Sequence, residues 1–327
     1  MSSFITNKKI LVTGGAGFIG SSLVESLLTA GNTVLCLDNF STGKRENISN
    51  FTGNNNFILI EGDIRDYAKC REAVNSVDLV YHQAALGSVP RSMADPITTT
   101  DVNIGGFVKI LFAAKEAGVK RFVYAASSST YGDSASLPKV EENIGKPLSP
   151  YAITKFADEL YAENFSKIYG IAVIGLRYFN VFGRRQDPDG PYAAVIPKFL
   201  RLLKDHKQPV INGDGEISRD FTYIDNVILA NHLAGLVEDP GALNQVYNVA
   251  CGERTTLNRM FGLIRSFAGK YDSDILKITP EYGPERAGDI LHSLASIEKI
   301  GRFLGYKPTH SVEKGLEESV DWFWKNL

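Results

Sequence analysis

A glycine-rich turn near the start of the chain constrains its fold more than any other feature. The residues TGGAGFIG link a β-branched, apolar run at Lys9–Thr13 to a helical pattern at Gly17–Ala30. At this spacing, Gly14 permits a tight turn, Gly17 allows a phosphate to approach the backbone, and Gly20 allows close helix–strand packing. The sequence therefore predicts a strand, a turn and a helix whose N-terminus can bind a diphosphate.

An acidic residue at the end of the next predicted strand indicates which dinucleotide is bound. This strand spans Thr33–Asp38, and Asp38 stands at its C-terminal end. A carboxylate there can accept hydrogen bonds from the adenosine ribose hydroxyls and repels a 2′-phosphate, so the predicted cofactor is NAD rather than NADP. Asp63 follows a later strand and is either a contact to the adenine amino group or a residue that caps a turn or helix.

The pattern of apolar residues predicts the fold class. In the first half, short β-branched runs alternate with longer helical patterns, as in βαβ units on a parallel sheet. Strands are predicted at Lys9–Thr13, Thr33–Asp38, Phe57–Glu61, Leu79–His82, Arg121–Ala126, Ile171–Tyr178 and Gln245–Val249. Helices are predicted at Gly17–Ala30, Asp101–Ala117, Pro150–Tyr169, Val195–Asp205, Ile224–Glu238, Thr256–Phe267, Ile297–Leu304 and Val312–Phe323. We expect an α/β fold, with a Rossmann-type doubly wound parallel sheet over residues 1–180 and a smaller C-terminal α/β lobe over residues 181–327, some segments being interleaved.

Composition excludes several classes of protein. The 327 residues carry a net charge of −2 and no basic stripe, which argues against a nucleic-acid partner. No apolar run approaches the roughly 20 residues of a membrane-spanning helix, and the start of the chain has no secretory signal pattern. Cys36, Cys70 and Cys251 are widely spaced, which argues against a disulfide framework or a zinc site. We therefore expect reduced thiols, no bound metal, no membrane partner and a cytoplasmic location.

A tyrosine and a lysine on one predicted helix form a candidate catalytic pair. Tyr151 and Lys155 are four residues apart, so their side chains project from the same helix face. A free tyrosine has a pKa of about 10 and is a poor base at neutral pH. A nearby ammonium group and an oxidised nicotinamide both favour the phenolate. The pair thus predicts a general base for a sugar hydroxyl, although Tyr and Lys also occur at this spacing on surface helices.

A run of hydroxyl residues supplies a third candidate group. Ser127 follows a predicted buried strand, and ligands of open α/β sheets bind beyond the carboxyl ends of the strands. We expect Ser127 to hydrogen-bond the reacting oxygen beside Tyr151, with Ser128 as the alternative. A simple turn is the structural explanation of the same residues.

Together these motifs resemble the extended short-chain dehydrogenase/reductase family, and within it the UDP-sugar 4-epimerases. The resemblance runs through essentially the whole chain, and it is greatest to the UDP-N-acetylglucosamine 4-epimerases of bacterial surface-polysaccharide biosynthesis. It includes Arg177–Asn180, Arg219–Asp225 and Arg286–Asp289. It implies reversible C4 epimerisation through a 4-keto sugar, with bound NAD reduced and reoxidised in each cycle and Tyr151 taking the O4 proton.

The resemblance also implies two sets of binding residues. The NAD contacts are expected from Gly14, Gly17, Phe18, Ile19, Asp38, Asn39, Ser41, Thr42, Gly43, Asp63, Ile64, Gln83, Ala84, Ala85, Asn103, Tyr151, Lys155 and Tyr178. The UDP-sugar contacts are expected from Gly87, Ser88, Ser127, Ser128, Ser129, Tyr151, Asn180, Ala194, Val195, Lys198, Arg219, Arg286, Asp289 and Ser293.

Substrate choice is inferred from smaller differences within the resemblance. Related 4,6-dehydratases have acidic residues where this chain has Ser128 and Ser129, so the groups for elimination are absent. Galactose-type epimerases have a tyrosine where this chain has Ser293, and a small residue leaves room for a 2-acetamido group. We expect UDP-GlcNAc and UDP-GalNAc as substrates, with UDP-Glc and UDP-Gal as further ones. The alternatives are a UDP-hexuronic acid 4-epimerase, a net oxidoreductase, and a non-catalytic NAD-binding sensor or scaffold.

The family likeness further implies a homodimer formed through a four-helix bundle. The predicted helices Asp101–Ala117 and Pro150–Tyr169 carry apolar residues on more than one face, namely Phe107, Ile110, Leu111, Phe156, Leu160 and Phe165. The alternative is that these residues are buried against the chain's own sheet.

Overall fold

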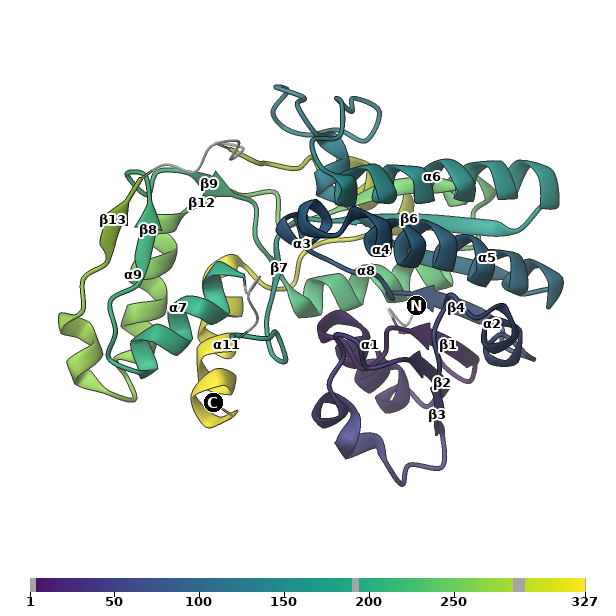
Figure 1. The fold of residues 1–327 in the computed structure, drawn as a ribbon, viewed down its shortest axis with the longest axis horizontal. Coiled ribbons are helices and arrows are strands. Elements are labelled where there is room, and N and C mark those ends of the chain that lie inside the picture. The colour runs from purple at the N-terminus through teal and green to yellow at the C-terminus, as the bar shows by residue number, and fades with distance from the viewer. Residues whose placement is uncertain (1–3, 190–193, 285–291, 327) are drawn as a thin grey trace.

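A seven-stranded parallel sheet forms the centre of the computed structural model, which describes residues 4–189, 194–284 and 292–326 (Figure 1). In spatial order its strands are β11 (Gln245–Val249), β6 (Ala172–Tyr178), β5 (Arg121–Ser127), β4 (Leu79–His82), β1 (Lys9–Thr13), β2 (Thr33–Asp38) and β3 (Phe57–Glu61). Every neighbouring pair in the sheet is parallel. The order reverses at β1, as in a doubly wound sheet, and the predicted fold class is confirmed.

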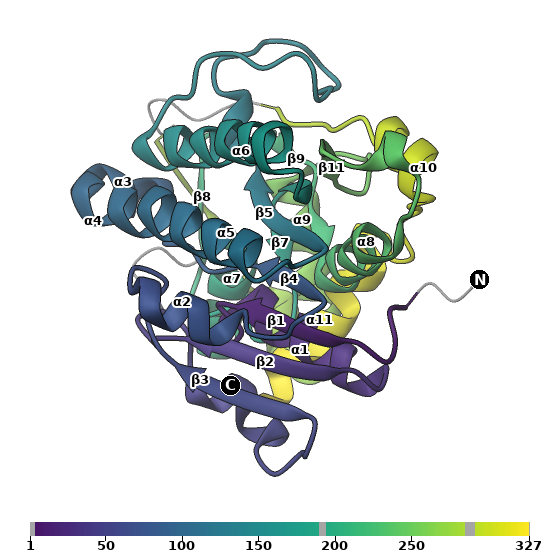
Figure 2. The same cartoon turned by 90° about the vertical axis from the view of Figure 1, so that its right-hand side faces the viewer.

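Helices cover both faces of the sheet, because successive residues of each strand point to opposite sides. On β1, Val12 packs with α1 (Phe18–Thr29) and α8 (Ile224–Leu236), whereas Leu11 packs in a second cluster. The helices of that second cluster are α2 (Tyr67–Ala73), α5 (Phe107–Glu116) and α6 (Pro150–Tyr169). Figure 2 shows α5 and α6 side by side on one face of the sheet and α8 on the other.

Most of the remaining elements form a lobe at the left of Figure 1. Its helices are α7 (Val195–Lys204), α9 (Leu257–Ala268) and α11 (Val312–Asn326), whereas α10 (Glu298–Leu304) packs against β11 and α8. Its short strands are β7 (Val181–Phe182), β8 (Val210–Asn212), β9 (Ser218–Arg219), β10 (Thr222–Tyr223), β12 (Thr255–Thr256) and β13 (Glu281–Gly283). Because β11 and α8 follow residue 180 yet belong to the sheet layer, one apolar core runs through both parts.

Several predicted helix ends were wrong by one to three residues. Gly17, Thr256 and Ile297 precede their helices as N-caps, and the Thr256 hydroxyl accepts a hydrogen bond from the Arg259 amide at 3.2 Å. The helix predicted to reach Glu238 ends at Leu236, since Val237 has extended backbone angles. Helix ends fray and sequence periodicity does not separate a cap from the first helical residue, so errors of one or two residues at each end are expected.

Short elements between the long ones were not predicted. They include α3 (Val89–Ala94), α4 (Pro96–Thr100), and the 3-10 turns η1 (Arg45–Phe51), η3 (Ser128–Tyr131), η4 (Pro240–Ala242) and η5 (Ser273–Lys277). The helix predicted at Asp101–Ala117 begins with a π-helical turn, η2 (Asp101–Gly106), before α5 starts. Such turns are frequent at functional sites, and η2 contains Asn103.

Most of the apolar residues that suggested a helix-bundle partner have a different role. Four of them are buried in the chain's own core: Phe107, Ile110, Leu111 and Phe165. For these residues the alternative of burial against the sheet holds. Leu160, in contrast, is 52% exposed on α6. Within the described ranges, no helix combines the length and apolar character that crossing a membrane requires.

Candidate active site

The glycine turn after β1 has the geometry that its sequence predicts. Gly14 has a φ of +67°, and a Cβ added there would lie 2.7 Å from the backbone of Ala84. A Cβ on Gly20 would lie 2.0 Å from the carbonyl oxygen of Gly14, so the first turn of α1 packs directly on the glycine turn. The backbone N–H groups at the start of α1 thus lie beside a surface that only glycine allows, and this surface can accommodate a diphosphate.

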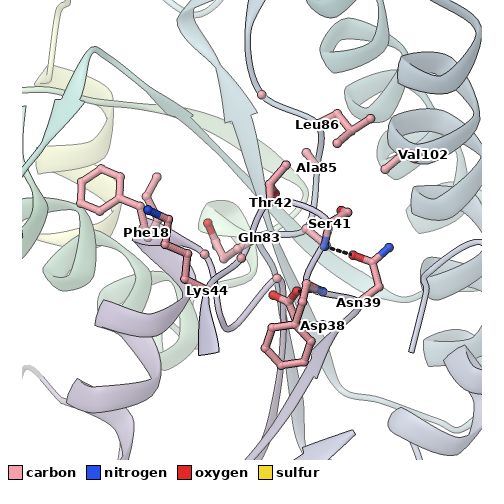
Figure 3. A pocket seen from close by; sticks show the side chains of 18 of the residues that line it. Phe18, Asp38, Asn39, Ser41, Thr42, Lys44, Gln83, Ala85, Leu86 and Val102 are labelled. Carbon is pink, nitrogen blue, oxygen red and sulfur yellow. Dashed lines mark hydrogen bonds between the residues drawn. The ribbon is translucent and has the colours of Figure 1, made fainter. Parts of the chain in front are cut away.

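A cavity of about 690 Å³ lies at the carboxyl ends of β1, β2, β3 and β4. Figure 3 shows its labelled side chains, with Ala85, Leu86 and Val102 in the upper part of the view and Phe18 and Lys44 on the left. The predicted cofactor residues in its lining are Gly14, Gly17, Phe18, Ile19, Asp38, Asn39, Ser41, Thr42, Gly43, Asp63, Ile64, Gln83, Ala84 and Ala85. Gly87, Ser88 and Ala194 from the predicted substrate set also line it.

Asp38 joins two parts of the cavity wall. Its carboxylate is buried and accepts hydrogen bonds from the amides of Ala16 at 2.9 Å and Phe40 at 2.8 Å. The carboxylate therefore fixes both the glycine turn and the loop after β2, and an ionised carboxylate has further lone pairs for ribose hydroxyls. Two cations follow this loop, and both have acidic partners: Lys44 pairs with Asp187 at 2.9 Å, and Arg45 pairs with Glu61 at 2.7 Å and lies 4.0 Å from the centre of the Phe40 ring. These residues fit NAD better than a phosphorylated ribose.

Asp63 lies in the cavity wall and is also a turn residue. It lines the cavity, and its carboxylate also accepts from the Arg65 amide at 2.8 Å, as a turn residue does. Its second oxygen accepts from the Asn39 side chain at 2.8 Å. Hydrogen bonds from the Arg65 guanidinium lower the pKa of Asp63 to about 2, so the group is ionised at neutral pH.

Ser127 ends β5 opposite Tyr178 of β6, at the same sheet edge as the cavity. Its hydroxyl oxygen accepts hydrogen bonds from the Ser129 amide at 3.2 Å and the Ser129 hydroxyl at 2.9 Å. Ser128 begins the short turn η3. The serine run thus forms a turn, which was the alternative explanation of its sequence. Within this turn the hydroxyls of Ser127 and Ser129 are hydrogen-bonded to each other.

Helix α6 carries the predicted catalytic pair. The Ser149 hydroxyl caps the helix by accepting from the Ala152 amide at 3.2 Å, and Pro150 occupies the first turn. Tyr151 is half-buried. Lys155 is 2% exposed, and its ammonium donates to the Ala125 carbonyl at 3.0 Å and pairs with the carboxylate of Asp158 at 3.3 Å. A buried lysine needs such partners to remain charged.

Four predicted cofactor residues lie outside the lining of this cavity, and two of them are hydrogen-bonded to residues that line it. Asn103 accepts from the Leu86 amide at 2.8 Å, and its side chain donates to the Thr154 hydroxyl at 3.0 Å. The Tyr178 hydroxyl donates to the side-chain oxygen of Gln83 at 3.2 Å. Asn103 therefore ties the cavity edge to the first turns of α6, where the other two residues, Tyr151 and Lys155, are found.

The sequence did not identify every residue of the cavity wall. The additional residues are Gly20, Leu37, Phe40, Lys44, Gly62, Leu86, Arg91, Val102, Gln186 and Asp187. Gln186 and Asp187 come from a loop rich in Arg, Asp, Pro and Gly, whose length was the available indication of function. Asp187 pairs across the cavity wall with Lys44 at 2.9 Å.

The predicted diphosphate and sugar contacts gather around Asp220. The Asn180 side chain donates to the Asp220 carbonyl at 2.8 Å. The buried Asp220 carboxylate accepts from three backbone amides, those of Cys251, Gly252 and Ala295. Burial raises the pKa of Asp220 to about 7 against the effect of these hydrogen bonds.

Ser293 is hydrogen-bonded to the two residues that flank Arg219 in the sequence. Its amide donates to the Ser218 carbonyl at 3.1 Å, and its hydroxyl accepts from the Asp220 amide at 3.4 Å. Val195 and Lys198 lie in the first turns of α7, where Lys198 is exposed. Arg286 and Asp289 lie outside the described residues.

Comparisons with known proteins agree with this geometry. The model of the NAD dependent epimerase/dehydratase family matches residues 10–250. A putative UDP-glucose 4-epimerase of Methanocaldococcus jannaschii is 35% identical over 97% of this chain and 99% of its own length. The solved UDP-N-acetylglucosamine 4-epimerase of Methanobrevibacter ruminantium, in complex with UDP-N-acetylmuramic acid, is 40% identical, with a TM-score of 0.91 over 99% of this chain and 100% of that one. The UDP-glucuronic acid 4-epimerase of Bacillus cereus, solved with UDP-glucuronic acid and NAD, is 31% identical, with a TM-score of 0.86 over 98% of this chain and 100% of that one.

Proposed function

The chain belongs to the NAD dependent epimerase/dehydratase family, and we propose that it is a UDP-N-acetylhexosamine 4-epimerase with NAD as its cofactor. The observation that carries the proposal is the connection from the cavity edge to α6. Leu86, which lines the NAD cavity, is bonded to Asn103, and Asn103 is bonded to Thr154, the neighbour of Lys155. A phenol and an ammonium group therefore stand next to a dinucleotide site.

The chain's own groups supply the proton chemistry. We assign to the Tyr151 phenolate the role of taking the proton from O4 of the sugar and returning it after the sugar has turned. The buried Lys155 ammonium favours the phenolate, and Ser127 or Ser128 hydrogen-bonds the reacting oxygen. NAD, when bound, supplies the reversible oxidation at C4. Residues 1–180 would hold this cofactor, and residues 181–327 would hold most of the UDP-sugar.

The preference for N-acetylated sugars is supported by the surroundings of Ser293. Hydrogen bonds to Ser218 and Asp220 hold this small side chain close to Arg219, a proposed diphosphate contact. A wall residue in this place faces the sugar, and a serine there leaves space for a 2-acetamido group. The likeness to the epimerase of M. ruminantium supports the same class of substrate.

The direct test is incubation of the protein with UDP-GlcNAc, UDP-Glc and their uronic acids, followed by separation of the epimers. We expect the highest kcat/KM for UDP-GlcNAc. A clear preference for a uronic acid would favour the second candidate, a UDP-hexuronic acid 4-epimerase, which the likeness to the B. cereus enzyme keeps open. Steady accumulation of reduced cofactor would instead indicate a net oxidoreductase, and binding of NAD with no turnover of any sugar would indicate a sensor or scaffold.

A substitution at the wall tests the basis of the preference. We expect Ser293→Tyr to lower kcat/KM for UDP-GlcNAc at least tenfold, because the larger side chain occupies the space of the acetamido group, and to spare UDP-Gal. Ser296→Tyr is the control, since Ser296 lies three residues further along the same segment. Equal losses on both sugars in Ser293→Tyr would contradict the wall argument.

We further propose a cytoplasmic homodimer. The exposed apolar side chains on α3, α4 and α6 are Met93 at 67%, Ile97 at 81%, Ile153 at 54%, Leu160 at 52% and Ile168 at 62%. Exposed apolar residues on neighbouring helices are typical of protein–protein contacts. Sedimentation of the wild type against Leu160→Glu would test the dimer.

A further inference from the structure

Asp158 is a buried acidic residue that the proposed reaction does not use. It lies three residues after Lys155 on α6 and is 0% exposed. One carboxylate oxygen is 3.3 Å from the Lys155 ammonium, and the other has no hydrogen-bond partner among the described residues. A buried carboxylate with an unpartnered oxygen is costly, so its presence beside a catalytic lysine calls for a physical reason.

The groups packed around the pair leave Asp158 as the counter-charge of Lys155. Glu159, the next residue of α6, already pairs with Arg177 of β6, because its two carboxylate oxygens accept hydrogen bonds from that guanidinium at 2.9 and 2.7 Å. His82 of β4 is fully buried, and burial lowers its pKa to about 3, so it is neutral. Tyr124 of β5 also interacts with Asp158, and burial raises the pKa of Tyr124 well above its usual value.

The hydrogen bonds of Lys155 show how the pair constrains the ammonium. A lysine ammonium has three N–H donors, and two of them point to the Ala125 carbonyl and the Asp158 carboxylate. Burial raises the pKa of Asp158 to about 7, and the Lys155 ammonium opposes this rise. The ammonium therefore stabilises the charged form of Asp158, and this charge is complete only above that pH.

We propose that Asp158 is a positioning residue that fixes the ammonium of Lys155, which stands one helical turn after Tyr151, and offsets part of its charge, so that it sets the pH at which the phenolate forms. The proposal rests on the proposed role of Tyr151 as the base. Asp158 follows Tyr151 by seven residues, which is about 10 Å along a helix axis. At that separation, with an effective dielectric constant of about 20, loss of one full negative charge favours the phenolate by about one pH unit, which is the upper limit because Asp158 is fully charged only above about pH 7.

The test compares two charge-neutralising substitutions on the same helix of the full-length protein. Asp158→Asn keeps the side-chain shape and an acceptor oxygen but removes the charge. Glu163→Gln removes a charge at a position that is 57% exposed, so it serves as the matched control. We expect the acidic limb of kcat/KM against pH to move toward lower pH by up to about one unit in Asp158→Asn and to stay unchanged in Glu163→Gln.

A second measurement reports the phenolate without substrate. The ultraviolet absorbance of phenolate is titrated in each background with and without Tyr151→Phe, and the difference isolates Tyr151. An acidic shift in Asp158→Asn supports the proposal. An unmoved midpoint, with kcat lowered equally at every pH, overturns it and leaves Asp158 a purely structural residue. Should Asp158→Asn fail to fold, Asp158→Ser removes the same charge. Absence of epimerisation in the wild type would refute the proposed function, while the absorbance titration would still decide the role of Asp158.

Discussion

Gly14→Ala is expected to damage both the stability of the protein and its binding of NAD. Gly14 has a φ of +67°, in the left-handed region, where an alanine costs about 1–2 kcal/mol. The added Cβ would also lie 2.7 Å from the Cα and amide nitrogen of Ala84 and 3.0 Å from the carbonyl carbon of Gln83. These are backbone atoms, so no side-chain rotation relieves the overlap, and overpacking of this kind costs a further 1–3 kcal/mol or so.

The sum is about 2–5 kcal/mol, and it falls on the turn that lines the cofactor cavity. If displacement of the turn removes only about 2 kcal/mol from the free energy of NAD binding, NAD affinity falls by roughly 30-fold. Urea unfolding gives the loss of stability, and the NAD content of the purified protein with calorimetric titration gives the loss of affinity.

Gly31→Ala is the matched control for this prediction. Gly31 has a φ of +82° in the turn between α1 and β2, and a Cβ there would have no atom within 4 Å. It should therefore lose only the strain of about 1–2 kcal/mol and keep its NAD. If Gly14→Ala unfolds at the same urea concentration as Gly31→Ala and retains the wild-type NAD content, the close-approach argument is wrong.

Two further predictions concern the catalytic tyrosine and acid stability. Tyr151→Phe should retain NAD yet lose at least about 100-fold in kcat, the usual size of a general-base contribution, as measured by product separation; full activity would refute the assignment of the base. His232 is buried between the Ile5 amide and the Ser26 hydroxyl, and burial lowers its pKa to about 4. Because the unfolded chain takes up this proton near pH 6.5 and the folded chain does not until about pH 4, the histidine contributes stability at neutral pH that is lost as the pH falls through this window. We therefore expect the urea midpoint to fall less for His232→Gln than for the wild type when the pH is lowered from about 7.5 to about 4.5. The difference should correspond to about 2–3 kcal/mol in the free energy of unfolding. An equal or greater fall in the variant would show that acidification does not remove stability contributed by His232.

The strands of the sheet and the type of cofactor site could be predicted from sequence because their causes are local. Lys9–Thr13, Thr33–Asp38 and Leu79–His82 were predicted with their observed bounds, since buried parallel strands are short apolar runs. Fourteen of the predicted cofactor residues line the cavity, because the loops after neighbouring parallel strands meet at one sheet edge.

Contacts between distant segments could not be predicted in the same way. The burial of Phe107 rather than its exposure to a partner depends on which face of α5 meets the sheet. Asn103 is assigned to the cofactor by resemblance, whereas in the fold its bonds connect Leu86 to Thr154. Asp187 and Lys44 pair at the cavity although they are more than 140 residues apart in the sequence, and no local pattern predicts such a contact.

The sequence by itself determined the doubly wound sheet, the glycine turn and the Tyr151–Lys155 pair, because strand alternation, turn conformation and helix spacing are properties of neighbouring residues. Only the tertiary structure decided that Lys155 is buried with Asp158 as its counter-charge and that Asp220 accepts hydrogen bonds from three backbone amides of two separate segments. Burial and charge pairing depend on the surroundings that the whole fold creates, and a residue's position in the chain does not reveal them.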